Sequence, residues 1–342
     1  MKKTILAMAV PALLVAGAAN ASVNLYDADG VVVDIAGAAE IQYINKYDAR
    51  AKGADGNDPY LRIDDADLIL TTSIAVNDSL DAVAGMGFKY EGDTNDTGGV
   101  ESDELYVGLG GDFGTLTFGR QLLISDDAGN AKDHELGTEQ INFVQTSGAQ
   151  VIKWVYDNGT FYAGANIDLD SDIAKGQDGR QIIGGRLGAR VDALDARVYL
   201  YDGEKLTASS FAPTGTTLED VSGFNLEADY DLGAFDLSAA YGVLEYKDSA
   251  AKSNKNDVDV WQISGGYQAD EQTYFALGFD MVDSDKAGNY NKYEGNSLYA
   301  NVTYKLATNA KVYAEIGTAD VKKDGVDQDT DTGYVVGMEV KF

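Results

Sequence analysis

The chain of 342 residues contains no cysteine, three prolines and one histidine. Without cysteine, neither a disulfide nor a thiolate metal site can hold the fold together. Proline cannot donate a hydrogen bond to a strand ladder, so its scarcity suits a protein built mostly of paired strands. A serine–histidine–aspartate triad would depend on His134 alone, and no cysteine nucleophile exists. These absences argue against an enzyme.

Positive charge is also scarce. The chain has 26 Lys and Arg against 56 Asp and Glu, which gives a formal net charge of −30. Nucleic-acid binding needs a basic surface, so we expect no nucleic-acid partner. Many carboxylates are tolerated on water-exposed loops or along a water-filled channel. An acidic secreted protein would have the same composition, so charge alone does not decide between these classes.

Long apolar runs are absent except near the start. Met1–Lys3 is cationic, Ile5–Gly17 is mostly apolar, and Ala19–Ala21 has small residues where a signal peptidase reads. The apolar stretch is shorter than the ~20 residues that a membrane-spanning helix needs. We therefore predict a signal peptide over residues 1–21 and a single domain over residues 22–342. An exported chain without a spanning helix is either water-soluble or a β-barrel.

Apolar and polar residues alternate with a period of two along much of the chain. From Tyr334 to Phe342 every second residue is apolar or aromatic, and the intervening residues include Gly337 and Glu339. The pattern recurs over residues 224–232, 235–243, 274–281 and 298–306. Period two is typical of a strand with two different faces. Because the second face is often small or acidic over the whole strand, we interpret it as the wall of a wet lumen, with the apolar face toward lipid.

Short and long connections alternate between these strands. The short ones carry Asn, Asp and Gly, as tight hairpins do, and lie at 77–78, 111–114, 157–159, 192–195, 231–234, 269–272 and 307–310. The long ones lie near 48–60, 91–103, 121–149, 168–180, 202–221, 247–257, 283–297 and 320–332. This alternation predicts about sixteen strands in a closed membrane barrel. Tyrosines near strand ends are candidates for two interfacial aromatic girdles, among them Tyr43, Tyr199, Tyr241 and Tyr267.

Several segments resemble the trimeric general porins of Gram-negative outer membranes. They are Asn77–Leu80, Phe113–Arg120 and Trp154–Phe161. The last strand, with Tyr334 and the terminal Phe342, resembles the signal that the barrel-assembly machinery reads. The resemblance covers residues 22–342. It implies an all-β fold, a 16-stranded antiparallel transmembrane β-barrel with an inward-folded third loop. It also implies a homotrimer among lipopolysaccharide and outer-membrane lipid, passing ions and small hydrophilic solutes without a cofactor or metal.

The third long connection is the candidate pore constriction. In the general porins this loop presents carboxylates to a cluster of arginines on the barrel wall, and opposed charges at a narrow point set ion selectivity. The corresponding acids here are Asp126, Asp127, Asp133, Glu135 and Glu139. Glu135 is the first candidate, because His134–Gly137 resembles the family's loop-tip motif.

The wall departs from the family. Asp67, Glu104 and Asp157 fall where general porins carry arginine, so the basic side of the constriction is thinned. We expect the remaining wall cations to be Arg120, Lys153, Arg186 and Arg190. The resulting pore should be net acidic and favour cations.

Two other interpretations remain at this stage. A substrate-selective channel, such as a sugar porin, would line its path with stacking aromatic residues. A calcium-binding secreted β-protein would use acidic loops such as Asp327–Gly333. That loop lacks the spacing of an EF-hand, because Met338 stands where the bidentate glutamate belongs.

Overall fold

The computed structural model describes residues 22–47, 50, 53, 58–90, 92–93, 99–138, 140–169, 180–209, 212 and 216–342. The predicted signal peptide and Glu139 lie outside this part of the chain. Among the described residues, no helix has the length and apolar character needed to cross a membrane.

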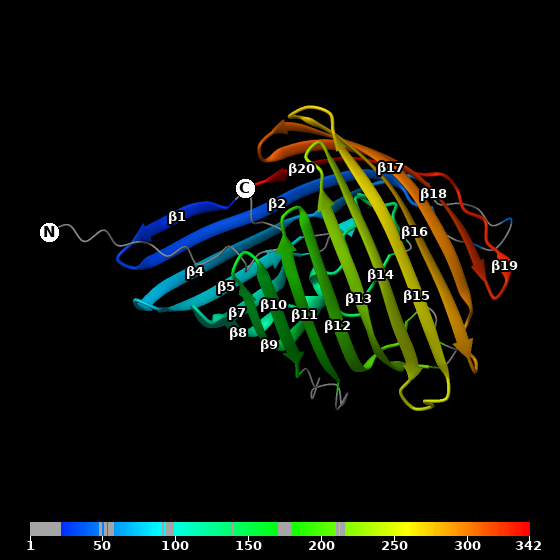
Figure 1. Ribbon diagram of the computed structural model, residues 1–342, viewed down its shortest axis with the longest axis horizontal. Helices are drawn as coiled ribbons and strands as arrows, with labels where there is room; N and C mark the ends of the chain where they lie inside the picture. The colour runs from blue at the N-terminus through cyan, green and yellow to red at the C-terminus, as the bar shows by residue number, and fades with distance from the viewer. Residues whose placement is uncertain are drawn as a thin grey trace.

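The chain forms one closed antiparallel β-barrel of 16 strands (Figure 1). β3 (Tyr60–Asp65) and β4 (Asp67–Asn77) are two halves of one barrel strand, interrupted at Ala66. The other strands are β2 (Val31–Asn45), β5 (Leu80–Lys89), β7 (Glu101–Gly111), β8 (Gly114–Leu122), β9 (Ser147–Asp157), β10 (Phe161–Asp168), β11 (Gln181–Val191), β12 (Leu194–Thr207), β13 (Leu218–Asp231), β14 (Phe235–Asp248), β15 (Lys255–Gln268), β16 (Thr273–Ala287), β17 (Tyr293–Ala307), β18 (Ala310–Lys323) and β20 (Gly333–Lys341). Two-residue strands β6 (Gly92–Asp93) and β19 (Val326–Asp327) lie within loops.

The barrel closes where the first and last strands meet. β20 pairs with the second half of β2, and β1 (Val23–Ala28) pairs with its first half. Gly37 and Phe342 exchange two backbone hydrogen bonds of 2.7 and 2.9 Å at the junction. The β1–β2 hairpin turns at Asp29 and Gly30, with φ of 55° and 75°. This Asp-Gly pair is typical of a tight hairpin turn, but it was not among the seven turns predicted from the sequence.

The two faces of the strands follow the predicted alternation. In β20, Val336 and Met338 are 55% and 45% exposed, whereas Val335 is fully buried. In β13, Leu226 and Tyr230 point outward and Asn225 and Glu227 inward. The prediction of a barrel with an apolar outer face is confirmed.

The seven predicted short turns are all present, but several long connections are shorter than predicted. The connection expected over 283–297 spans only 288–292, because β16 continues to Ala287 and β17 begins at Tyr293. These strand ends carry outward acids such as Asp283 and Asp285, which resemble loop sequence. The strands here extend beyond the apolar band, so composition misplaced their ends.

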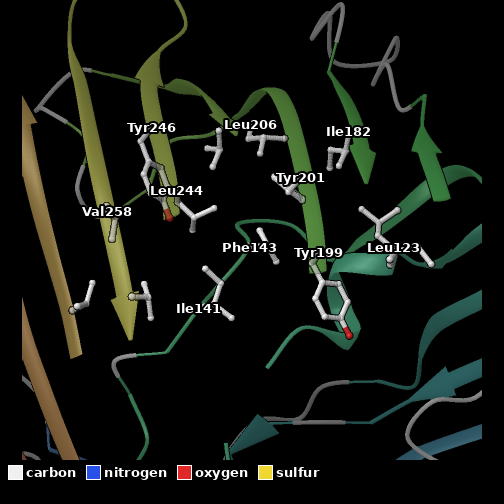
Figure 2. Close-up of a cluster of buried hydrophobic side chains, with 14 of the residues drawn as sticks. Leu123, Ile141, Phe143, Ile182, Tyr199, Tyr201, Leu206, Leu244, Tyr246 and Val258 are labelled. Carbon is white, nitrogen blue, oxygen red and sulfur yellow. The ribbon is translucent and has the colours of Figure 1, made fainter. Parts of the chain in front are cut away.

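The prediction of a wet lumen along the whole strand is wrong for part of the barrel. Apolar side chains on the inner faces of β11–β16 pack against the third loop and form a dry cluster (Figure 2). The cluster includes Leu123, Ile141 and Phe143 of the loop, with Ile182, Tyr199, Tyr201, Leu206, Leu244, Tyr246 and Val258 of the wall. For the same reason Tyr199 belongs to this interior and not to an outer aromatic girdle, whereas Tyr43 and Tyr267 face outward.

Candidate pore constriction

Loop 3, residues 123–146, runs along the inner wall of the barrel. Its base is closed by a 2.7 Å hydrogen bond from the Leu123 N–H to the Thr146 carbonyl. A single 3-10 turn, η1 (Ile124–Asp127), follows, and the Ile124 N–H donates to the Asn166 side chain at 2.9 Å. The loop therefore starts against the inner face of β10.

The next contact with the wall is an ion pair between Asp127 and Arg186 at 2.5 Å. The Tyr199 hydroxyl donates to the Asp127 carbonyl at 2.8 Å. The Arg186 guanidinium also lies over the rings of Tyr162 and Tyr199, 5.2 and 5.8 Å from their centroids. Arg186 thus lies on the inner face and holds the loop, and its charge is shared with an acid.

The middle of the loop crosses β13 to β17. The Gly129 N–H donates to Glu227 at 2.6 Å, and the Asn130 amide donates to Asp229 at 3.1 Å. The Lys132 ammonium pairs with Asp236, and the Lys132 carbonyl accepts from Asn301 at 2.7 Å. Four of these strands, β13, β14, β15 and β17, therefore supply at least one polar contact each.

Glu315 of β18 holds the loop tip. Its carboxylate accepts the backbone N–H groups of His134, Glu135 and Leu136 at 2.7, 2.8 and 2.7 Å. The His134 ring stacks on Tyr313 with centroids 3.7 Å apart. Burial, with Lys311 nearby, lowers the pKa of His134 to about 4, so the ring is neutral at physiological pH.

Glu135 reaches across the tip to the first strands. Its carboxylate pairs with Arg62 at 2.5 Å and Lys46 at 3.2 Å, and it accepts from the Gln42 amide at 3.0 Å. Burial acts to raise the pKa of Glu135, but the Gln42 hydrogen bond and the charges of Lys46 and Arg62 outweigh it and lower the pKa. Glu135 is therefore an ionised anchor.

The four described loop acids have different environments. Asp127 and Glu135 are ion-paired, and Asp133 accepts from the Gly137 N–H and the Gln140 amide at 2.9 Å each. Asp133 therefore shapes the turn of the loop. Asp126 is the solvent-exposed member of this set. The acid of loop 3 that contacts the water of the pore is therefore Asp126 and not Glu135.

Two of the predicted wall residues meet at the base of loop 3. Glu104 of β7 is 6% exposed and accepts the Leu122 N–H at 3.3 Å. Lys153 of β9 donates to the Leu122 carbonyl at 2.8 Å. Asp67 begins β4, where its side chain is hydrogen-bonded to that of Asp65. Glu104 and Asp67 thus lie on the part of the barrel wall that is formed by the early strands β4 and β7.

Asp157 and Arg190 form an ion pair of 2.7 Å near the short-turn end of β9 and β11. Arg190 also lies 3.2 Å from Asp195, and its guanidinium is 4.2 Å from the centroid of Tyr162. These residues line the mouth on the turn side, away from the loop tip.

The assignment of Arg120 to the pore wall is wrong. In β8, Thr117 and Gln121 are buried and hydrogen-bonded to each other at 2.6 Å on the inner face. Arg120 alternates with them and shares the exposed face of Phe118 and Leu122. The period of two places its side chain on the outside of the barrel.

The sequence did not single out several residues that organise the site. These are Arg62, Asp64, Arg197, Glu227, Asp229 and Glu315. Arg197 pairs with Glu227 and Asp229 at 2.6 Å each, and Arg62 with Asp64 at 2.6 Å. The only sequence signal for Glu227, Asp229 and Glu315 was their position on the polar face of a strand. Many other residues share that position, so the signal did not distinguish them.

Comparisons with known proteins settle the family. A model of the Gram-negative porin family matches residues 6–324. Porin-like protein H of Photobacterium profundum is 42% identical over the whole of both chains. The chain belongs to the Gram-negative porin family.

Solved outer-membrane barrels share the fold of this porin. OmpT of Vibrio cholerae is 20% identical, with a TM-score of 0.74 over 92% of this chain and 99% of its own. An anion-selective porin from Comamonas acidovorans is 17% identical, with a TM-score of 0.70 over 91% of this chain and 100% of its own. Because the chain belongs to the Gram-negative porin family, the protein is an outer-membrane channel and not an enzyme.

Loop 3 contacts only part of the lumen wall of this porin in the described hydrogen bonds and ion pairs. These contacts reach β10 to β15, β17 and β18, and then β2 and β3, whereas none is described to the inner face of β4, β5 and the middle of β7. That face carries the carboxylates of Asp67 and Glu104, with Asp65 and Asp126 close by.

Proposed function

We propose that this porin forms a water-filled channel for passive diffusion of ions and small hydrophilic solutes, and that it favours cations. We place the passage between loop 3 and the inner face of β4–β8, and the observation that carries the proposal is the acidity of that region. Asp67 lies on the inner face of β4, Glu104 lies on β7 at the base of loop 3, and Asp126 is exposed on the loop. Two wall positions where the general porins have arginine are therefore negative within the passage itself.

The cations of the lumen support this proposal because they are engaged by acids. Arg62 is shared by Asp64 and Glu135, and Arg197 by Glu227 and Asp229. Lys153 donates to a backbone carbonyl and interacts with the charges of three acids, Glu104, Asp127 and Asp126, and of one cation, Arg186. A charge near a narrow opening acts through a lower effective dielectric than in bulk water. Charges farther than ~8 Å are screened at physiological ionic strength.

The test is the reversal potential of the reconstituted porin in a potassium chloride gradient. We expect cation preference, stronger at low salt, and a clear reduction in the double variant Asp67→Asn, Glu104→Gln. Asp327→Asn is the matched control, because Asp327 is 75% exposed in the eighth loop and should leave selectivity unchanged. Anion preference in the parent protein, or no response to the double variant, would refute the proposed selectivity. The anion-selective Comamonas porin shows that this fold does not determine whether a channel prefers cations or anions.

The proposal includes a homotrimer in contact with lipopolysaccharide and outer-membrane lipid, inserted by the barrel-assembly machinery through the Tyr334–Phe342 strand. A trimer form of Vibrio cholerae OmpT among the similar structures supports the oligomeric state. Mass photometry in mild detergent should give one species of three subunits. A monomer with full conductance would contradict it.

A further inference from the structure

An apolar groove on the outer face of the barrel crosses β13 to β16, which lie side by side (Figure 1). Its volume is about 500 Å³. Ala228 and Ala239 are directly opposed and form its floor, because neither side chain extends beyond Cβ. Leu226, Ile263 and Phe279 stand around this floor. The outer surface is thus hollowed where two small residues meet.

A ledge of aromatic rings borders the groove on the side of the long loops. Tyr241 and Trp261 are directly opposed, with ring centroids 4.2 Å apart, and Phe224 lies edge-on to Tyr241 at 6.0 Å. The Tyr241 hydroxyl donates to the outward carboxylate of Asp259 at 2.7 Å. Rings with an apolar body and a polar tip gather where hydrocarbon meets water. This aromatic ledge therefore lies near the outer edge of the hydrocarbon.

The groove occupies the outer half of the apolar band. On β14 the outward residues are apolar or aromatic from Phe235, at the short-turn end, to Val243, and Ala239 is midway between them. Among the described residues, none that lines the groove lies nearer the short turns than Ala239 and its cross-strand neighbours. Because the long loops of bacterial barrels are external, the groove faces the outer leaflet of the membrane.

The same strands carry two lysines farther toward the long loops. Lys247 of β14 and Lys255 of β15 are directly opposed on the outer face, and their side chains are 36% and 38% exposed. Glu245 pairs with both lysines, and Asp257 pairs with Lys255 at 2.8 Å. Each ammonium has three N–H donors, so both lysines keep a donor for a further acceptor. Like charges directly opposite each other destabilise a sheet, and an anion between them would relieve the repulsion.

The spacing between the lysines and the groove matches one lipid leaflet. Lys255 and Ile263 lie eight residues apart on β15. At a rise of ~3.3 Å per residue and a strand tilt of about 40°, the lysines lie roughly 20 Å farther out. Half of a bilayer, headgroups included, is about as thick. A lipid whose phosphate lay between the lysines would therefore reach the groove with an acyl chain.

We infer that the groove binds an acyl chain of lipopolysaccharide, and that Lys247 and Lys255 bind a phosphate of the same molecule. The protein is an outer-membrane porin, so lipid covers this face and the groove is continuous with the lipid-covered surface. Lipopolysaccharide carries several acyl chains on a phosphorylated headgroup, which suits a phosphate site placed above an apolar groove. The inference deepens the lipopolysaccharide contact of the proposed function by naming its site.

The first test fills the groove. Trp261 lines it and becomes the only tryptophan in a Trp154→Phe background, so its fluorescence reports occupancy when the porin in detergent is titrated with purified lipopolysaccharide. We expect saturable binding, weakened about tenfold by Ala239→Phe, because the new ring displaces roughly two buried methylenes of the acyl chain. Ala300→Phe is the matched control, because Ala300 lies on the outer face of β17 outside the groove.

The second test removes the headgroup contact. The double variant Lys247→Gln, Lys255→Gln should weaken lipopolysaccharide binding about tenfold, because it removes charge-assisted hydrogen bonds to the phosphate. Lys322→Gln is the control, because Lys322 is 54% exposed on β18, away from the groove. Phosphatidylglycerol, with one phosphate and two acyl chains, should bind the parent protein more weakly than lipopolysaccharide does.

The outcomes separate the possible occupants of the groove. Unchanged binding in either Ala239→Phe or the double lysine variant would overturn the inference, and so would equal affinity for phosphatidylglycerol. Self-association of the barrels that Ala239→Phe abolishes would place a second copy in the groove and overturn it as well. The titrations do not depend on ion conduction, so a porin that binds lipopolysaccharide here but prefers anions would refute only the proposed selectivity.

Discussion

The ring of Tyr313 lies against the backbone of Gly337, the residue directly opposite it on β20. A Cβ on Gly337 would be 2.2 Å from the ring of Tyr313. The same relationship joins Tyr106 to Gly85, Tyr162 to Gly188 and Tyr299 to Gly278, each a directly opposed pair on the inner face. The large inward tyrosines therefore depend on cross-strand glycines for space.

We expect Gly337→Val to destabilise the barrel by about 1–3 kcal/mol, the usual range for overpacking. The added methyl groups displace the Tyr313 ring, whose hydroxyl bonds Glu40 and accepts from Gln42 at 2.8 Å. The measurement is the urea midpoint of unfolding from lipid vesicles. Gly99→Val is the control, because nothing lies within 4 Å of a Cβ at Gly99. Equal urea midpoints for the two variants would show that the Tyr313 ring can move aside without a cost in stability.

Glu315 is predicted to keep loop 3 in place. Glu315→Ala removes the acceptor for three backbone N–H groups at the tip, and each buried unsatisfied donor costs about 1–3 kcal/mol. We expect larger current fluctuations and altered single-channel conductance in planar bilayers. Glu294→Ala, on the outer face of the adjacent strand β17, should leave the traces unchanged. If the current through Glu315→Ala fluctuates no more than that through the parent protein, the apolar contacts of the tip are sufficient to hold it in place.

The apolar contacts of the tip are tested with Leu136. Its side chain is fully buried between Tyr47, Tyr299, Ala319 and Val321. Leu136→Ala should destabilise the folded barrel by about 2–5 kcal/mol, as in other buried Leu→Ala changes. Leu277→Ala serves as the control, since Leu277 is 57% exposed on the outer face. If the thermal midpoint falls equally in both, the tip contributes no more than the outer surface does.

Acidification should loosen the tip through His134. A released histidine has a pKa near 6.5, whereas the docked ring has a pKa of about 4, so the docked tip binds fewer protons below pH 6.5. Docking is therefore weakened progressively as the pH falls from 6.5 to 4. Glu135, with its lowered pKa, loses its ion pairs only below its ordinary value of 4.5, but burial raises the pKa of Asp133, so the contribution of His134 is isolated by a variant that lacks the histidine. Hydrogen exchange of residues 134–136 at pH 5 and 7 measures the effect.

His134→Phe is the matched variant for that measurement, because it keeps an aromatic ring against Tyr313 but cannot be protonated. Exchange in this variant, corrected for the intrinsic pH dependence, should differ little between pH 5 and 7. A parent protein with equally flat behaviour would show that His134 does not control the tip.

The barrel was predictable from the sequence because period-two alternation and short turns are local signals. The strand ends could not be predicted in the same way, because Asp283 and Asp285 lie on β16 although acidic residues are typical of loops. The candidate site was predictable in kind but not in detail. Which acid is exposed to the pore water depends on partners distant in sequence: Glu135 pairs with Arg62, Asp127 pairs with Arg186, and Asp126 stays exposed. Arg120 was misplaced because a motif match does not say which face a residue takes.

Loop 3 touches both sides of the seam where the barrel closes. Its tip is bound by Glu315 of β18 and by Gln42 of β2, the two strands that flank β20. The tip thus ties the beginning of the chain to its end from the inside. The seam between β2 and β20 has its own ladder of backbone hydrogen bonds, and the contacts of the tip add to it from the lumen side. Separation of the first and last strands would therefore also disturb the contacts that hold loop 3 in the pore, so the closure of the barrel and the position of its constricting loop are mechanically linked.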